Sequence, residues 1–152
     1  VMVVALDERV RTARTAAKPD DDFAKMMAER LATLSSQLKA EVAFARGDVD
    51  AALAAGREAI LAEEAMGGEP PLLAGGSQVA LGDLLLRARR YPEAEAAFRA
   101  DLALQPGSGW ALRGLQAAVA AQNRGPEAQQ VQAEWARAWQ EADAALKAAA
   151  RS

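Results

Sequence analysis

The residues of this sequence that could do chemistry are its carboxylates and arginines, because the chain contains no histidine and no cysteine. Without these two residue types, a Ser-His-Asp or Cys-His nucleophile cannot be assembled. The usual ligands of zinc, haem iron and iron–sulfur clusters are missing as well, so we expect no metal and no cofactor. The glycine pairs Gly67-Gly68 and Gly75-Gly76 lack the spacing and the lysine of a phosphate-binding loop.

Two clusters of carboxylates remain as candidates for cation binding or acid–base chemistry. Asp20, Asp21 and Asp22 precede a helix, where a capping oxygen and negative charge are favourable, and no calcium-binding loop surrounds them. We therefore expect them to cap that helix. Glu63 and Glu64 fall near the end of another helix and fit a solvated surface better than an acid–base pair. The sequence predicts that the chain is not an enzyme.

Arginines and tryptophans form two further groups. Arg87, Arg89 and Arg90 end a helix, where cations interact favourably with the exposed carbonyls, and a site for phosphate or an acidic peptide is the alternative. Trp135 and Trp139 are four residues apart and share one face of the last helix. We expect them to pack against the preceding helices rather than to form a ligand site.

The composition favours helices along the whole chain. Of the 152 residues, 51% are hydrophobic but only 5% are aromatic, and alanine is abundant. Alanine has the best helix propensity, and no stretch alternates apolar and polar residues over the length of a strand. The net charge of −3 argues against nucleic acid as a partner. The longest strictly apolar run, Val1 to Leu6, is far short of the ~20 residues that span a bilayer.

Capping and breaking residues predict where the helices begin and end. Proline and glycine stop helices, and aspartate or serine starts them. The predicted boundary residues are Pro19, Gly47, Asp48, Pro106-Gly107, Ser108 and Gly125-Pro126. We expect the first helix over 2–16 and the last from about Glu127 to Ala149.

The sequence also aligns with itself. Laying 109–142 on 75–108 places Leu112 and Leu115 in register, and laying 33–66 on the same segment aligns Gly47 with Arg89. We read one domain, 1–152, with three helix pairs. Its predicted parts are a leading helix at 1–18, pairs at 33–66, 75–108 and 109–142, a loop at 67–74 and a helical extension at 143–152.

The middle pair, 75–108, resembles a tetratricopeptide repeat. That unit has a large apolar residue, Leu-Gly, an aromatic residue, alanine, a second aromatic residue and proline at fixed offsets. Residues 34–146 also look like the C-terminal region of large multi-repeat bacterial proteins of this family, which are mostly uncharacterised. The residues at the signature offsets are Gln78, Leu81, Gly82, Leu85, Ala94, Phe98 and Pro106.

The outer pairs depart from the signature. In the first pair, Lys39 and Gly56 stand where the signature has leucine and an aromatic residue. In the third pair, Gln116, Gln132 and Gln140 replace glycine, the aromatic residue and proline. Terminal repeats are commonly atypical because one of their faces meets water. A bundle of helical hairpins with one chance match is the alternative.

The resemblance implies an all-α solenoid of about three helix pairs, in which the first helix of each pair lines a concave groove. Such a groove binds a partner protein or an extended peptide. The residues that the resemblance places in the groove are Gln37, Glu41, Phe44, Val79, Asp83, Leu86, Arg87, Trp110 and Arg113.

Two other functions remain open at this point. The chain could cap a longer solenoid or build an oligomer through the apolar residues Val3, Val4 and Leu6, or it could be a non-catalytic regulatory domain of an enzyme. Because it opens at Val1 inside a predicted helix, we expect it to be a piece of a longer protein. A cytoplasmic location is expected, with the periplasm as the alternative.

Overall fold

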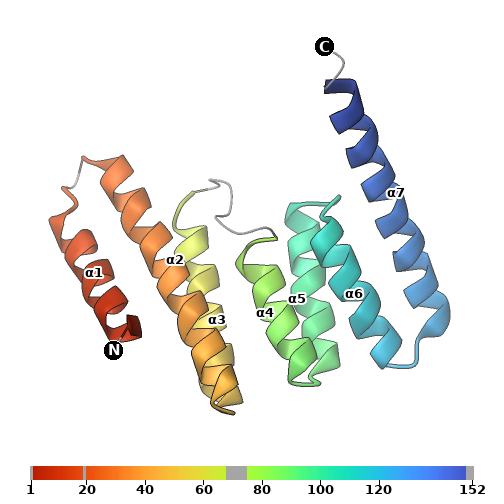
Figure 1. The fold of residues 1–152 in the computed structure, drawn as a ribbon, viewed down its shortest axis with the longest axis horizontal. Helices are drawn as coiled ribbons and strands as arrows, with labels where there is room; N and C mark the ends of the chain where they lie inside the picture. The colour runs from red at the N-terminus through yellow and green to blue at the C-terminus, as the bar shows by residue number, and fades with distance from the viewer. Residues whose placement is uncertain (1, 19, 68–74, 150–152) are drawn as a thin grey trace.

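The computed structural model describes residues 2–18, 20–67 and 75–149, and for 2–3 and 141–149 it describes the backbone alone (Figure 1). All regular secondary structure in this part of the chain is helical, which confirms the predicted all-α class. Residues 68–74 of the predicted loop, Val1, Pro19 and residues 150–152 lie outside the described residues. The helices are α1 (Met2–Ala16), α2 (Asp22–Ala45), α3 (Val49–Glu64), α4 (Gly76–Arg87), α5 (Tyr91–Leu104), α6 (Gly109–Ala121) and α7 (Gly125–Ala149).

Three of the predicted capping residues accept a hydrogen bond at the start of a helix. The carboxylate of Asp21 accepts from the backbone N–H of Ala24 at 2.8 Å, and that of Asp48 accepts from Ala51 at 3.0 Å. Ser108 accepts from the backbone N–H of Ala111. The acidic run before α2 therefore serves as a helix cap, as predicted. Such a cap stabilises a helix by about 1 kcal/mol.

The same tight turn joins α2 to α3, α4 to α5 and α6 to α7. In each turn one residue adopts a left-handed conformation, with φ of +82° at Gly47, +59° at Arg89 and +61° at Asn123. The residue after it donates a backbone hydrogen bond into the preceding helix, as Arg90 does to Leu85 at 2.9 Å. The three left-handed residues occupy equivalent positions when the segments 33–66, 75–108 and 109–142 are aligned.

The helices form a row in which each packs against its neighbours in sequence (Figure 1). In addition, α4 contacts both α2 and α6, so these three helices share one side of the molecule. Figure 1 shows α3 behind α2 and α5 behind α4. We call the surface formed by α2, α4 and α6 the front face. The result is an all-α fold with the character of a helical repeat.

Phe98 of α5 lies at the centre of the main core and is fully buried. Its ring rests directly on the backbone of α4 and of α6, at positions where neither helix has a side chain. A Cβ atom added to Gly82 would lie 2.6 Å from the ring, and one added to Gly114 would lie closer still. Glycine at these two sites therefore permits three helices to meet around one ring.

We predict that Gly114→Ala lowers the free energy of unfolding by about 1–3 kcal/mol, because its methyl group would overlap the Phe98 ring and the helices would have to separate. Gly107→Ala is the matched control, since a Cβ atom there meets nothing within 4 Å. Urea denaturation followed by circular dichroism measures both values. Equal stability of the two variants would show that the ring does not set the spacing of the helices.

Candidate functional site

All nine residues predicted to line the groove belong to α2, α4 and α6, the helices of the front face. Gln37, Phe44 and Leu86 are half-buried. The prediction for Val79 is wrong, because this side chain is only 6% exposed and belongs to the core. It packs in the main core, with its methyl groups close to Gly75. The exposed members of the set are Glu41, Asp83, Arg87, Trp110 and Arg113.

Arg87 joins α4 to α2. One of its terminal nitrogens donates hydrogen bonds to both carboxylate oxygens of Glu41, at 2.9 and 3.0 Å. Its guanidinium carbon also lies 4.1 Å from the centre of the Phe44 ring, which is a cation–π contact. These contacts with Glu41 and Phe44 hold the Arg87 side chain in place from two directions. Arg90, which follows the end of α4, instead pairs with Glu93 at 2.6 Å.

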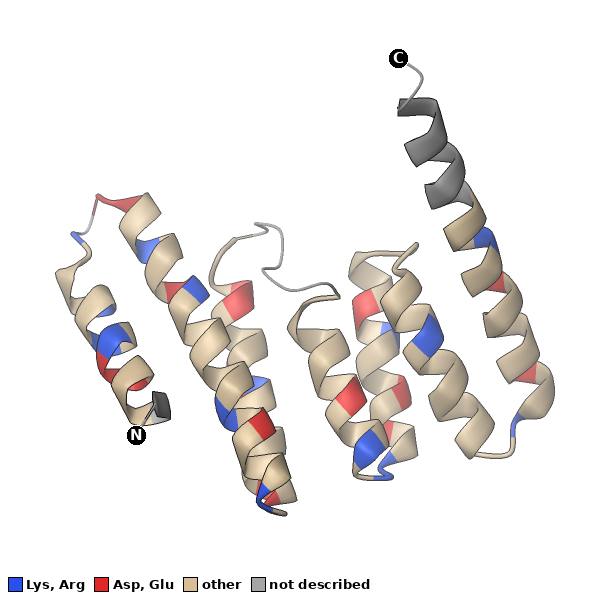
Figure 2. Ribbon diagram, in the orientation of Figure 1, with Lys and Arg blue, Asp and Glu red and all other residues tan. Residues whose placement is uncertain are grey.

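Asp83 and Arg113 extend this group of charges from α4 to α6. Although Asp83 is exposed as a residue, partial desolvation of its carboxylate raises its pKa above the usual value, while the positive charges of Arg113 and Arg87 oppose that rise. Arg113 is exposed and makes no hydrogen bond or ion pair with the described residues. We call Glu41, Phe44, Asp83, Arg87 and Arg113 the front patch. Figure 2 colours the charged residues on the ribbon. Helices α4 and α6 contain no charged residues other than Asp83, Arg87 and Arg113.

A cluster of three tryptophans lies beside the patch, between α6 and α7. Trp139 packs edge-to-face on Trp110, with ring centres 6.3 Å apart, and on Trp135, with centres 6.4 Å apart. It also lies against the backbone of α6, since a Cβ on Gly109 would be 2.8 Å from its indole nitrogen. The predicted packing of Trp135 and Trp139 against the preceding helix is confirmed. Trp110 and Trp139 remain 46% and 43% exposed, so the cluster also presents an aromatic surface.

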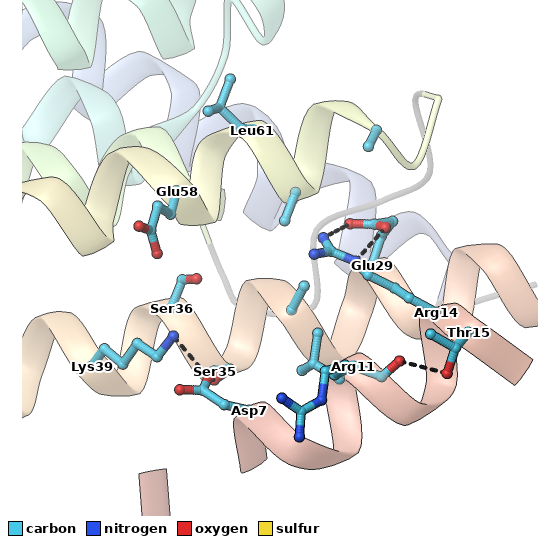
Figure 3. Close-up of a pocket in the computed structure, with 14 residues that line it drawn as sticks. Asp7, Arg11, Arg14, Thr15, Glu29, Ser35, Ser36, Lys39, Glu58 and Leu61 are labelled. Atoms are coloured by element: carbon cyan, nitrogen blue, oxygen red, sulfur yellow. Dashed lines mark hydrogen bonds and ion pairs between the residues drawn. The ribbon is translucent and has the colours of Figure 1, made fainter. Parts of the chain in front are cut away.

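A cleft of about 780 Å³ between α1, α2 and α3 was not predicted (Figure 3). Four of its charged groups form two ion pairs. Lys39 pairs with Asp7 at 2.7 Å, and Arg14 pairs with Glu29 at 2.5 Å. Hydrogen bonds from Lys39 and Ser35 lower the pKa of Asp7. The cleft could not be predicted from the sequence, because the spacing of residues along each helix does not give the distance between α1 and α3.

Glu63 has a structural role, and it is neither the solvated surface residue nor the acid–base group considered from the sequence. Its carboxylate accepts hydrogen bonds from the backbone N–H of Ser77, at 3.1 and 3.2 Å, and from the Ser77 hydroxyl at 2.8 Å. The residue before α4 is Gly75, which has no side chain to cap the helix. Glu63 of α3 therefore caps α4 from a neighbouring helix. Gln37 of α2 joins the group by donating from Nε2 to the Ser77 hydroxyl at 3.2 Å.

Asp101 is the most deeply buried carboxylate among the described residues, at 4% exposure. Burial raises its pKa; a hydrogen bond with Ser108 opposes the rise, and the negative charge of Glu63 adds to it. Its Oδ2 atom has no hydrogen-bond partner in the described part of the chain. A single enclosed carboxylate with one unpaired oxygen is a cost to stability rather than a catalytic pair.

No protein-family model matches the sequence, and neither the curated proteins nor the solved structures include a significant match. Within residues 2–18, 20–67 and 75–149, no group of three or more carboxylates is arranged to hold a metal ion. No helix of the described chain combines the length and apolar character needed to cross a membrane.

We predict that Asp101→Asn raises the melting temperature at neutral pH, because it removes a buried charge while keeping an acceptor for Ser108. The pKa of Asp101 is higher in the folded than in the unfolded protein, so the cost is fully present above the folded-state pKa. This destabilisation decreases as the pH falls from the folded-state pKa of Asp101 towards its unfolded-state pKa. Calorimetry over this range should show a gap between variant and wild type that narrows in acid.

The exposed Glu134 of α7 supplies the control for this experiment. Glu134→Gln should leave the melting temperature close to that of the wild type at each pH. If Asp101→Asn were less stable than the wild type at neutral pH, the carboxylate would be contributing stability and the argument from burial would fail.

Proposed function

We propose that this chain is a protein–protein interaction module of the tetratricopeptide type, which binds an extended segment of a partner protein on its front face. Three observations support the repeat assignment. The left-handed turns recur at equivalent positions of the three pairs, the first helices of successive pairs touch, and Phe98 is enclosed by two glycines. In this proposal α1 leads the array and the end of α7 extends beyond it.

The binding proposal rests mainly on Arg113, an exposed arginine without a hydrogen bond or ion pair in the described chain. Arg87 and Glu41 of the front patch form a direct ion pair, whereas Arg113 interacts with Asp83 only through the attraction of their charges. A guanidinium on a fixed helix offers five donors to a carboxylate, and arginine is enriched among the residues that dominate binding energy.

The surroundings of Arg113 indicate what the partner segment would contain. Trp110 lies three residues before it on α6, so both side chains point to the same side of the helix. An acidic side chain could pair with Arg113 while an adjacent apolar side chain packs on Trp110. Nucleic acid fits poorly, because Glu41 and Asp83 would repel phosphate close to the two arginines.

We also propose that the chain is not catalytic. It lacks histidine and cysteine. Among the described residues the most buried carboxylate is that of Asp101, which is influenced by the negative charge of Glu63, and Glu63 is already occupied in capping α4. The Ser77 hydroxyl that bonds to Glu63 is buried, and the Ser108 hydroxyl beside Asp101 caps α6 by accepting from the backbone N–H of Ala111.

Assembly with further helices is a second candidate function. Val4 of α1 is a large apolar residue that is 71% exposed. Among the described helices, α1 packs on α2 alone, so its other side is uncovered. A further repeat or a second copy of the chain would bury it. Sedimentation velocity tests the second copy: a monomer at every concentration would contradict self-association, and Val4→Asp should abolish any association found.

We predict that Arg113→Glu weakens binding of a selected peptide by about tenfold or more, because it replaces an attraction with a repulsion. Peptides are first selected from a displayed library against the wild-type chain. Their affinities for wild type and variants are then measured by fluorescence anisotropy. Arg87→Glu is expected to weaken binding as well, since it also breaks the link between α2 and α4.

Arg57→Glu is the matched control, because Arg57 is exposed on α3, away from the front face. It changes the net charge by the same amount and should change affinity by no more than about twofold, which is typical of a distant surface charge. If both patch reversals kept their helicity and their full affinity, the peptide would be binding elsewhere and the proposal would fail.

A further inference from the structure

A small cavity of about 130 Å³ lies between α2, α3 and α4, directly beside the front patch. Its walls are formed mainly by small and apolar side chains from these three helices. The residues that shape it are Ala40 of α2, Gly56 and Ala59 of α3, and Ala80, Leu81 and Leu84 of α4.

The cavity occupies the place that Phe98 fills in the next helix pair. When 33–66 is aligned with 75–108, Gly56 is equivalent to Phe98 and Ala40 is equivalent to Gly82. When 75–108 is aligned with 109–142, Ala80 is equivalent to Gly114. Phe98 lies on Gly82 and Gly114, whereas Gly56 has no side chain to place between Ala40 and Ala80. The helices around Gly56 are therefore arranged like those around Phe98, but no aromatic ring fills the space between them.

The size and lining of the cavity suit an apolar side chain. A protein cavity of about 150 Å³ lined by apolar groups stays dry and accepts benzene. The methyl groups of Ala40 and Ala80 make this site somewhat tighter than the one around Phe98. A side chain the size of leucine, methionine or phenylalanine matches the space. Leu81 and Leu84 would contact it from α4.

Two polar residues place the opening of the cavity on the front face. Glu41 lines the cavity and also belongs to the front patch through its bond to Arg87. Gln37 lines it one helical turn earlier, and its Oε1 atom is buried without a hydrogen-bond partner in the described chain. This carboxamide must donate to Ser77, because the Ser77 hydroxyl donates to Glu63. Its oxygen is therefore left with an unmet need for a donor.

We propose that this cavity is the anchor pocket of the peptide-binding face and takes one apolar side chain of the bound segment. The inference rests on the proposed function and specifies its ligand: an apolar anchor between α2 and α4, and an acidic residue further along that pairs with Arg113. The pocket thus selects for a side chain that resembles the missing ring.

The pocket can be filled from inside by Gly56→Met, whose unbranched side chain adapts to irregular gaps. A Cβ on Gly56 would lie 3.0 Å from Leu81 Cδ1, so a second variant guards against a packing defect. Ala80→Met closes the pocket from α4, where Ala80 is only partly buried. Ala100→Met, at an exposed position of α5, adds the same side chain away from the pocket and serves as the control.

The test is a titration with N-acetyl-leucine methylamide and N-acetyl-phenylalanine methylamide, followed by NMR of the leucine methyl groups. We expect saturable shifts of Leu81 and Leu84, and no shift of these methyls with N-acetyl-aspartate methylamide. Both pocket variants should abolish the shifts, and Ala100→Met should retain them. No saturable shift with either apolar probe, or shifts that persist in both pocket variants, would overturn the proposal.

Failure of the pocket can be distinguished from failure of the proposed function. If selected peptides lose affinity with Arg113→Glu but keep it with Gly56→Met and Ala80→Met, the front face binds peptides and the pocket is not their anchor. If library selection yields no peptide at all, the proposed function fails, and the NMR titration still reports on the pocket by itself.

Discussion

The contact of the Phe98 ring with two glycines fixes the geometry on which the front face depends. Because Gly82 and Gly114 have no side chains, α4 and α6 close around one ring. Asp83 follows the first glycine and Arg113 precedes the second, so the contact that packs the core also brings these two charges together across the helix boundary. The raised pKa of Asp83, opposed by Arg113, is an electrostatic consequence of this packing.

The helices could be predicted from the sequence because their ends are set by local chemistry. Asp21, Asp48 and Ser108 each act on a backbone group three residues away, and the left-handed turns sit where the self-alignment places them. Such features need only the spacing of residues along one helix. The assignment of the front-face residues to the first helix of each pair was instead implied by the resemblance of 75–108 to a tetratricopeptide repeat.

Other features depend on how separate helices approach, which spacing along one helix does not contain. The resemblance places Val79 in the groove, but this side chain packs in the main core. The cleft between α1 and α3 and the capping of α4 by Glu63 are also products of tertiary packing. Gly56 could be recognised in the sequence as a missing aromatic residue, but only the arrangement of three helices turns that absence into a cavity.

The front patch and the cavity have opposite effects on the stability of the fold. Arg87, held by Glu41 and Phe44, ties α2 to α4 and keeps the two walls of the cavity together. The unfilled space at Gly56 works against stability: at about 24 cal/mol per Å³, a cavity of this size costs on the order of 1–3 kcal/mol, with the lower value suited to a site open to water. The second helix pair avoids this cost by filling the same place with Phe98. In the proposed complex, an apolar side chain of the partner would recover this free energy in the first pair, so the cavity would contribute to the driving force for binding.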